Sequence, residues 1–261
     1  MTMRSPQSFA GCPQRIADSC PTKCHFDLKC SIKSQLINLF DYVGAFCYNN
    51  RIIMKGQPNL TMPHAQTPHP FLKRLKNLTQ PAHQQLEANL YAQRMVAGTI
   101  SQADYAAYLQ RLWPIHVTVE AEYQRWPDWA AYGFDITSRQ RAPLLAQDLA
   151  YLAYPLPADS HFPLSPGHDF AEMLAYLYVL EGSTLGGQVL LRKIKPVLGL
   201  TPQQGGAYFY SYGPQVGSQW QAVQQFLTDY VTQKPTAETV IINQANQFFE
   251  MIDQWLTAKL L

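Results

Sequence analysis

The segment YVLEGSTLGGQVL, residues 178–190, places three glycines inside an apolar stretch with helical spacing. A glycine inside a helix costs about 1 kcal/mol relative to alanine, so the bare backbone needs a reason. Gly182 and Gly186 are four residues apart and share one face of the predicted helix. Glycine is favoured where backbone approaches a ligand closely, which indicates a broad, flat, apolar ligand. A tight helix–helix crossing is the alternative. A phosphate loop is excluded, because G-x-G-x-x-G, G-K-[ST] and a preceding strand are all missing.

If that ligand is a porphyrin, a side chain must hold its iron, and histidine is the commonest choice. His83 lies beside the apolar stripe of the first predicted helix, with Thr79 and Glu87 one turn away on either side. Lys76 is seven residues back, nearly two turns along the same face, where an ammonium could meet a propionate. A lone helical histidine is more often a packing residue, and His116 is the alternative ligand.

The elements that must position these side chains are all helical. Apolar residues recur at helical spacing from Phe71 to Leu90, Ser101 is a good N-cap, and Pro114 is expected to bend or break the helix that follows. Further helices are predicted over 116–126, 138–154, 168–198, 217–232 and from 236 onwards, with a loop at 201–217. No alternating strand pattern is found. We therefore predict an all-α, single-domain helical bundle.

The chain divides in composition near residue 62. All five cysteines lie before residue 48, and residues 1–62 contain no glutamate. The spacing Cys20-x3-Cys24-x5-Cys30 is a poor zinc pattern. We expect residues 1–62 to be a poorly ordered, dispensable extension and residues 63–261 to form the helical domain.

Charge and hydropathy exclude several classes of function. Residues 63–261 carry 13 Lys/Arg against 15 Asp/Glu, so a nucleic-acid partner is not expected. No stretch has the ~18–20 apolar residues of a membrane helix, and the N-terminus does not resemble a secretory signal. The cysteine-free body favours a cytoplasmic location.

Four segments together resemble the haem oxygenase family. They are LKNLTQPAHQQLE (75–87), RLWPIHVTVE (111–120), YVLEGSTLGGQVL (178–190) and YFYSYGPQVGSQW (208–220). The resemblance covers about residues 70–256 and is greatest to the bacterial branch that supplies biliverdin to phytochromes. It implies a helical fold in which haem lies between a proximal helix and a kinked distal helix.

The resemblance also implies roles for individual residues. His83 matches the proximal iron ligand, Glu87 the carboxylate one turn on, and Lys76 a basic residue near a propionate. Thr79 is on the same helix face. The distal glycines over the porphyrin match three positions, Gly182, Gly186 and Gly187. Arg192 and Lys193 are further propionate candidates.

One residue departs from the pattern of the mammalian relatives, which have an aspartate where this chain has Ser183. A hydroxyl can join a water chain but supplies no negative charge, so the backbone and waters of the distal helix are expected to carry protons. We therefore predict that Gly182, Ser183, Gly186 and Glu87 support catalysis.

The implied reaction opens haem to biliverdin, carbon monoxide and ferrous iron, using O2 and electrons from an external reductase or ferredoxin. Haem is both substrate and cofactor, and a bacteriophytochrome is a candidate acceptor of the product. Two alternatives stay open. One is a haem carrier or sensor of the same fold, and the other is a thiaminase-like or quinone-cofactor-synthesis protein. A cysteine-free body argues against the thiaminase version.

Overall fold

The computed structural model describes residues 69–159 and 161–258, so the predicted extension over residues 1–62 lies outside it. The described chain is built of helices, with only isolated β-bridges around Thr201, which confirms the all-α class. The α-helices in chain order are α2 (Pro70–Glu87), α3 (Leu90–Ala97), α4 (Gln102–Tyr123), α5 (Asp128–Ala131), α6 (Ala142–Tyr151), α7 (Phe170–Leu198), α8 (Ala207–Tyr210), α9 (Val216–Gln233) and α10 (Ala237–Thr257). Two short 3-10 helices, η1 (Thr137–Arg139) and η2 (Gly213–Gln215), complete the described elements.

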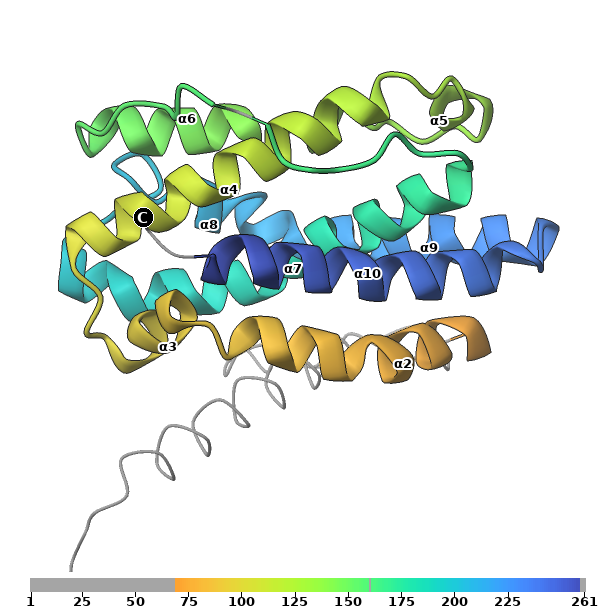
Figure 1. The fold of residues 1–261 in the computed structure, drawn as a ribbon, viewed down its shortest axis with the longest axis horizontal. Helices are drawn as coiled ribbons and strands as arrows, with labels where there is room; N and C mark the ends of the chain where they lie inside the picture. Colours follow the sequence, from red (N-terminus) through yellow and green to blue (C-terminus); the bar gives the residue numbers. More distant parts are fainter. Residues whose placement is uncertain (1–68, 160, 259–261) are drawn as a thin grey trace, which may run out of the picture.

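The helices form three layers (Figure 1). α2 and α3 lie on one side, α4 and α6 lie on the other, and α7 to α10 fill the middle. α10 packs against both α7 and α2, while α4 packs against α6, and α8 lies against both α6 and α7. The glycine-rich helix α7 is therefore placed between the layer that carries His83 and the layer that carries His116.

Local signals explain several of the helix ends. Ser101 caps α4 by accepting a hydrogen bond from the backbone N–H of Asp104 at 3.0 Å. Asn89 accepts from the N–H of Ala92 and starts α3, which divides the stretch predicted as one helix into α2 and α3. Gly199 ends α7 in the left-handed region, with φ of 67°.

Two sequence predictions about helix packing are wrong. Pro114 does not break α4, which continues from Gln102 to Tyr123 with Pro114 buried inside it. Packing of α4 against α6, α7 and α10 outweighs the lost hydrogen bond of the proline. The predicted apolar stripe from Phe71 to Leu90 is also interrupted: Leu78 of α2 is 56% exposed and Leu90, which begins α3, is 57% exposed, although Ala82 and Leu86 pack against the core.

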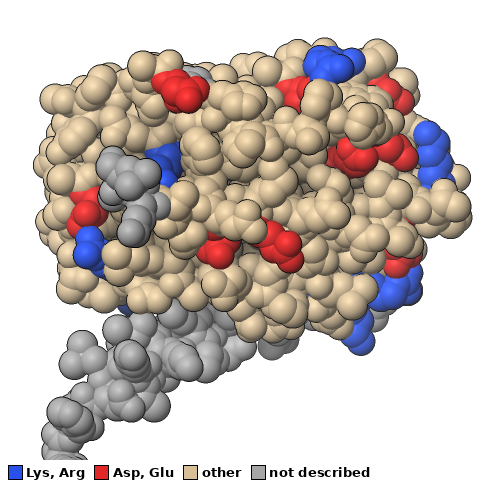
Figure 2. All heavy atoms as spheres, viewed as in Figure 1, with Lys and Arg blue, Asp and Glu red and all other residues tan. Residues whose placement is uncertain are grey.

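None of the described helices is long and apolar enough to cross a bilayer. On the face shown in Figure 2, acidic and basic side chains are scattered between broad uncharged areas. The charged groups of that face do not form a continuous basic surface.

Candidate functional site

A cavity of about 250 Å³ opens between α2, α7 and α8, with α4, α9 and α10 closing its sides. This volume is just below the roughly 300–1,000 Å³ of small-molecule pockets. Its walls are mostly apolar and aromatic, including Leu112, Ile115, Tyr178, Trp220 and Phe249. The predicted site residues that line it are Lys76, Thr79, His83, Glu87, Gly182, Ser183, Gly186 and Gly187. The structure therefore brings together eight predicted residues from two helices about a hundred residues apart.

His83 presents one edge of its imidazole ring to this cavity. Its Nδ1 is buried and lies 3.7 Å from Oε2 of Glu87, and Phe249 of α10 contacts the ring edge-on at 5.3 Å between centroids. The side chain is nevertheless 33% exposed and lines the cavity. Burial, together with the positive charge of Lys76, lowers the pKa of His83 to about 4. The ring is therefore neutral at pH 7, as a metal ligand must be.

Glu87 and Thr79 hold α2 on either side of His83. Burial raises the pKa of the Glu87 carboxyl to about 7. The Thr79 hydroxyl donates to the carbonyl of Leu75 at 2.8 Å and lies 3.3 Å from the Tyr178 hydroxyl of α7. Thr79 therefore joins α2 to α7 instead of reaching into the cavity as a free polar group.

The three glycines of α7 have different surroundings. A Cβ at Gly186 would have no protein atom within 4 Å apart from its own helix, although Gly186 lines the cavity. A Cβ at Gly182 would meet Trp220 at an ordinary 3.4 Å, whereas one at Gly187 would lie only 3.0 Å from Phe209 of α8. Gly186 thus faces open cavity space, and Gly187 permits close packing of α8 against α7.

Two predicted residues have less direct roles. The Ser183 hydroxyl donates to the Leu180 carbonyl of its own helix at 2.6 Å, and Ser183 also lines the cavity. Arg192 is an exposed residue near the end of α7 and does not line the cavity. The structure therefore does not bring Arg192 to the predicted site.

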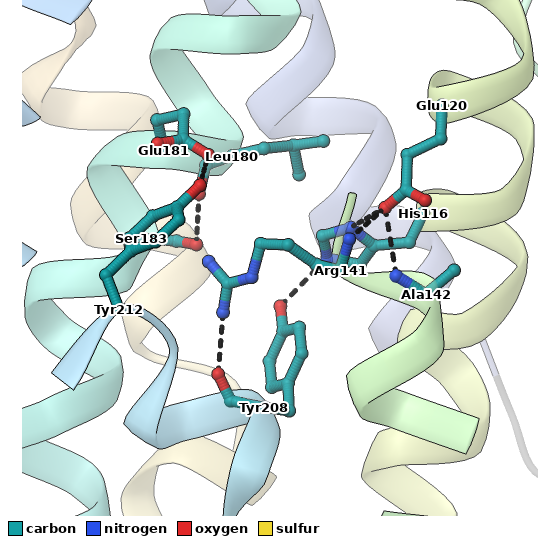
Figure 3. A network of polar contacts seen from close by, with 9 residues as sticks. All are labelled: His116, Glu120, Arg141, Ala142, Leu180, Glu181, Ser183, Tyr208 and Tyr212. Atoms are coloured by element: carbon teal, nitrogen blue, oxygen red, sulfur yellow. Dashed lines mark hydrogen bonds and ion pairs between the residues drawn. The ribbon is translucent and has the colours of Figure 1, made fainter. Parts of the chain in front are cut away.

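A buried polar network lies behind the glycine side of the cavity (Figure 3). His116 of α4 has Nδ1 at 3.3 Å from Oε1 of Glu120 and Nε2 at 2.9 Å from the Tyr208 hydroxyl. The same Glu120 oxygen accepts hydrogen bonds from the backbone N–H groups of Arg141 and Ala142 at 2.7 and 3.0 Å. Burial lowers the pKa of His116 and raises that of Tyr208, so both are neutral at pH 7.

A second part of the network fixes the backbone beside Gly182. Glu181 accepts from Nη1 of Arg139 and from the Tyr212 hydroxyl, both at 2.8 Å. Arg139 and Glu181 are almost fully buried, with side-chain exposures of 7% and 3%. Since breaking a buried pair leaves an uncompensated charge, this pair stabilises α7 at its glycine segment.

Asp148 of α6 positions Tyr208. Its two carboxylate oxygens accept from the backbone N–H groups of Ala207 and Tyr208, each at 2.8 Å. Burial raises the pKa of this carboxyl to about 6, although these two hydrogen bonds oppose the shift. The α8 turn, which carries Tyr208 to the cavity wall, is therefore anchored to α6.

The sequence analysis did not identify Glu120, Arg141, Tyr208 or Glu181 as site residues. One signal was available, because His116 and Glu120 repeat the i, i+4 spacing of His83 and Glu87. The other contacts join residues 21 to 92 positions apart, so no local pattern predicts them.

Comparison with known proteins agrees with this arrangement. A sequence model described as haem oxygenase matches residues 69–258, while a search among curated proteins finds no match. A haem oxygenase structure from Leptospira interrogans is similar with a TM-score of 0.62 and 17% identity, covering 73% of this chain and all of that one. Two haem oxygenases from the cyanobacterium Synechocystis were solved in complex with haem. Haem oxygenase-1 has a TM-score of 0.57 and 17% identity, covering 72% of this chain and 91% of that one.

Haem oxygenase-2, whose structure also contains NO, has a TM-score of 0.58 and 20% identity and covers 72% and 84% of the two chains. At these identities the likeness to solved structures establishes the fold. The family match extends over most of the chain and over every helix described above. With its all-helical fold and a cavity between a histidine and a glycine-rich helix, the chain belongs to the haem oxygenase family, the enzymes that degrade haem to biliverdin.

Proposed function

We propose that the cavity holds haem, with His83 as the iron ligand. The observation that carries this proposal is the neutral imidazole of His83, which lines a mostly apolar cavity that also has the bare backbone of Gly186 on its wall. A flat macrocycle fits between a ligand on α2 and a helix face without side chains. The buried Nδ1 side, next to Glu87 and Phe249, keeps the ring in one orientation.

His116, the second candidate iron ligand, already has hydrogen-bond partners. Both ring nitrogens of His116 have partners, Glu120 and the Tyr208 hydroxyl, so this imidazole would have to give up a hydrogen bond to reach iron. The glycine side of the cavity is therefore suited to a small ligand such as O2. In this proposal, Gly186 leaves space for that ligand and Ser183 contributes a hydroxyl nearby.

Charged groups on α2 would orient the bound molecule. Lys73 and Lys76 both line the cavity, Lys73 exposed and Lys76 half-buried, so their ammonium groups suit the carboxylates of haem. Arg192 has no part in this proposal, because it does not line the cavity.

Haem bound here would supply the iron that activates O2, and the chain's own residues bind it, orient it and limit access of water. Electrons would come from an external reductase or ferredoxin. We further propose, from the sequence resemblance and from Ser183, that the chain is of the phytochrome-associated branch and that a bacteriophytochrome accepts the biliverdin.

A haem titration followed by turnover tests this proposal. Purified protein with haemin should develop a Soret band, and with reductant under air that band should decay as biliverdin absorption appears. A Soret band that is stable under reductant and air would instead support a non-catalytic haem carrier. No Soret band at all would contradict both functions.

A further inference from the structure

Arg141 has hydrogen-bond donors without partners at the cavity wall. It immediately precedes α6, is only 3% exposed, and reaches towards Ser183 of α7 (Figure 3). Its Nη2 donates to the Tyr208 carbonyl at 2.7 Å, and the guanidinium lies 4.5 Å from the centroid of the Tyr208 ring. Its Nε and Nη1 are buried and have no hydrogen-bond partner among the described residues. A buried cation with unused donors is costly unless a ligand satisfies it.

The two carboxylates of the neighbouring network do not neutralise this charge. Glu120 accepts through Oε1 from two backbone N–H groups and lies next to His116, while Glu181 is bound by Arg139 and Tyr212. Within the described part of the chain, no carboxylate oxygen lies within the 4.0 Å of an ion pair from the Arg141 guanidinium. Arg141 lines the main cavity and also a second pocket of about 10 Å³, which it shares with Glu120 and Glu181.

The donor and acceptor roles around His116 and Tyr208 show which side chains can donate a hydrogen bond to an anion. Because Glu120 Oε1 is an acceptor for two backbone donors, His116 donates to it through Nδ1–H. Neutral His116 is then an acceptor at Nε2, so the Tyr208 hydroxyl donates to His116. The Tyr208 hydroxyl then has no hydrogen to give to an anion, whereas Arg141 has unused N–H donors.

We propose that Arg141 forms a binding site for a small anion on the glycine side of the cavity, apart from the edge that His83 presents. The site takes a compact ligand of one negative charge with oxygen or nitrogen acceptors, for which azide is a probe. The role of this site rests on the proposed function. In that function, O2 that takes up electrons gains negative charge on its oxygen atoms. The buried position of Arg141, unlike that of Lys73 or Lys76, favours a small separate ion over a flexible carboxylate arm of the macrocycle.

The test compares the wild type with Arg141→Leu, Arg141→Lys and the exposed control Arg192→Leu. Haem affinity is measured from the Soret band, and azide affinity from the spectrum of the ferric, haem-loaded protein. Charge-assisted hydrogen bonds are about twice as strong as neutral ones, so Arg141→Leu should weaken azide binding about tenfold or more. The azide affinity of Arg141→Lys should lie between those of the wild type and Arg141→Leu. The azide affinity of Arg192→Leu should match that of the wild type. Circular dichroism checks that each variant folds. If Arg141→Leu does not fold, the comparison of Arg141→Lys with the wild type decides the test.

Two results would overturn the proposal. One is azide affinity that is unchanged in the Arg141 variants. The other is a loss of haem affinity in Arg141→Leu that disappears with haem dimethyl ester, since Arg141 would then bind a carboxylate of the macrocycle. If the wild type gives no Soret band, the proposed function fails by itself. The anion site is then judged from the unfolding temperature of the apo-protein in azide against chloride: a rise that Arg141→Leu abolishes supports it, and no rise overturns it.

Discussion

The two histidine–glutamate pairs of the cavity have the same i, i+4 spacing but different environments. His83 and Glu87 on α2 are 3.7 Å apart, with side-chain exposures of 33% and 25%. His116 and Glu120 on α4 are 3.3 Å apart, with exposures of 1% and 10%. His83 lines the cavity, whereas His116 is buried with hydrogen-bond partners at both ring nitrogens, and Glu120 also binds two backbone N–H groups.

This difference separates a binding role from a positioning role. A neutral imidazole that lines the cavity, as His83 does, is in the protonation state that a metal ligand requires. An imidazole that has partners on both sides instead fixes its neighbours, here Tyr208 and the start of α6. The same residue types at the same spacing therefore have different exposure and partners because different helices surround them.

The largest expected effect is on turnover. His83→Ala should reduce biliverdin formation below detection, and added imidazole should restore part of it. The variant should keep some haem, since burial of the apolar macrocycle supplies much of the affinity. His116→Ala should keep the Soret band of the wild type. Unchanged spectrum and turnover in His83→Ala would reverse the comparison and give His116 the ligand role.

Stability should separate the two glutamates. Glu120→Ala leaves two buried backbone donors and His116 without their acceptor, at about 1–3 kcal/mol for each unsatisfied group. We expect about 3 kcal/mol or more of lost unfolding free energy in urea. Glu87→Ala should change it by at most about 1 kcal/mol. Equal losses in the two variants would show that the pairs are structurally equivalent.

Substitutions at Gly186 and Gly187 of α7 should also have different effects. Gly187→Leu overpacks against Phe209 and should cost the apo-protein about 1–3 kcal/mol. Gly186→Leu should leave apo stability intact or raise it by up to about 1 kcal/mol, yet weaken haem binding, because its side chain enters the cavity. Thermal unfolding and haem titration measure both effects. A large fall in apo stability for Gly186→Leu with intact haem affinity would contradict a ligand-facing Gly186.

The smallest effect expected is a pH dependence from Glu87. Its folded-state pKa of about 7 exceeds its ordinary 4.5, so the stability that it contributes is complete below pH 4.5 and is lost as pH rises through 7. The depressed pKa of His83, about 4, acts oppositely: its contribution is present above pH 6.5 and is lost as pH falls towards 4. As pH rises from 5 to 8, the unfolding free energy of Glu87→Gln should therefore increase relative to that of the wild type.

The expected gain is about 1–2 kcal/mol in apo unfolding, reduced because the Glu87 side chain is 25% exposed. Glu238→Gln is the control, since a hydrogen bond from Arg74 lowers the pKa of Glu238. The difference in unfolding free energy between Glu238→Gln and the wild type should not change over this pH range. An equal slope for Glu87→Gln and the wild type would show that Glu87 is not the titrating group.

The helical class, the glycine helix and the histidine on α2 could be predicted from the sequence. They depend on local properties, which are apolar periodicity, N-caps such as Ser101 and a glycine C-cap such as Gly199. Pro114 shows the limit of local rules. Its helix-breaking cost of about 3 kcal/mol is exceeded by packing of α4 against three other helices, which no local window contains.

The sequence by itself determined which residues can bind: an imidazole beside a carboxylate on one helix and a bare backbone on another. Only the tertiary structure decided which histidine is partly exposed, which is fully buried, and which glycine faces the cavity. It also brought Arg141, which local patterns do not single out, to the cavity wall. The physical reason is that local spacing fixes the face of a helix on which a side chain lies. Its partners, pKa and access to ligand depend on which distant helices pack against that face.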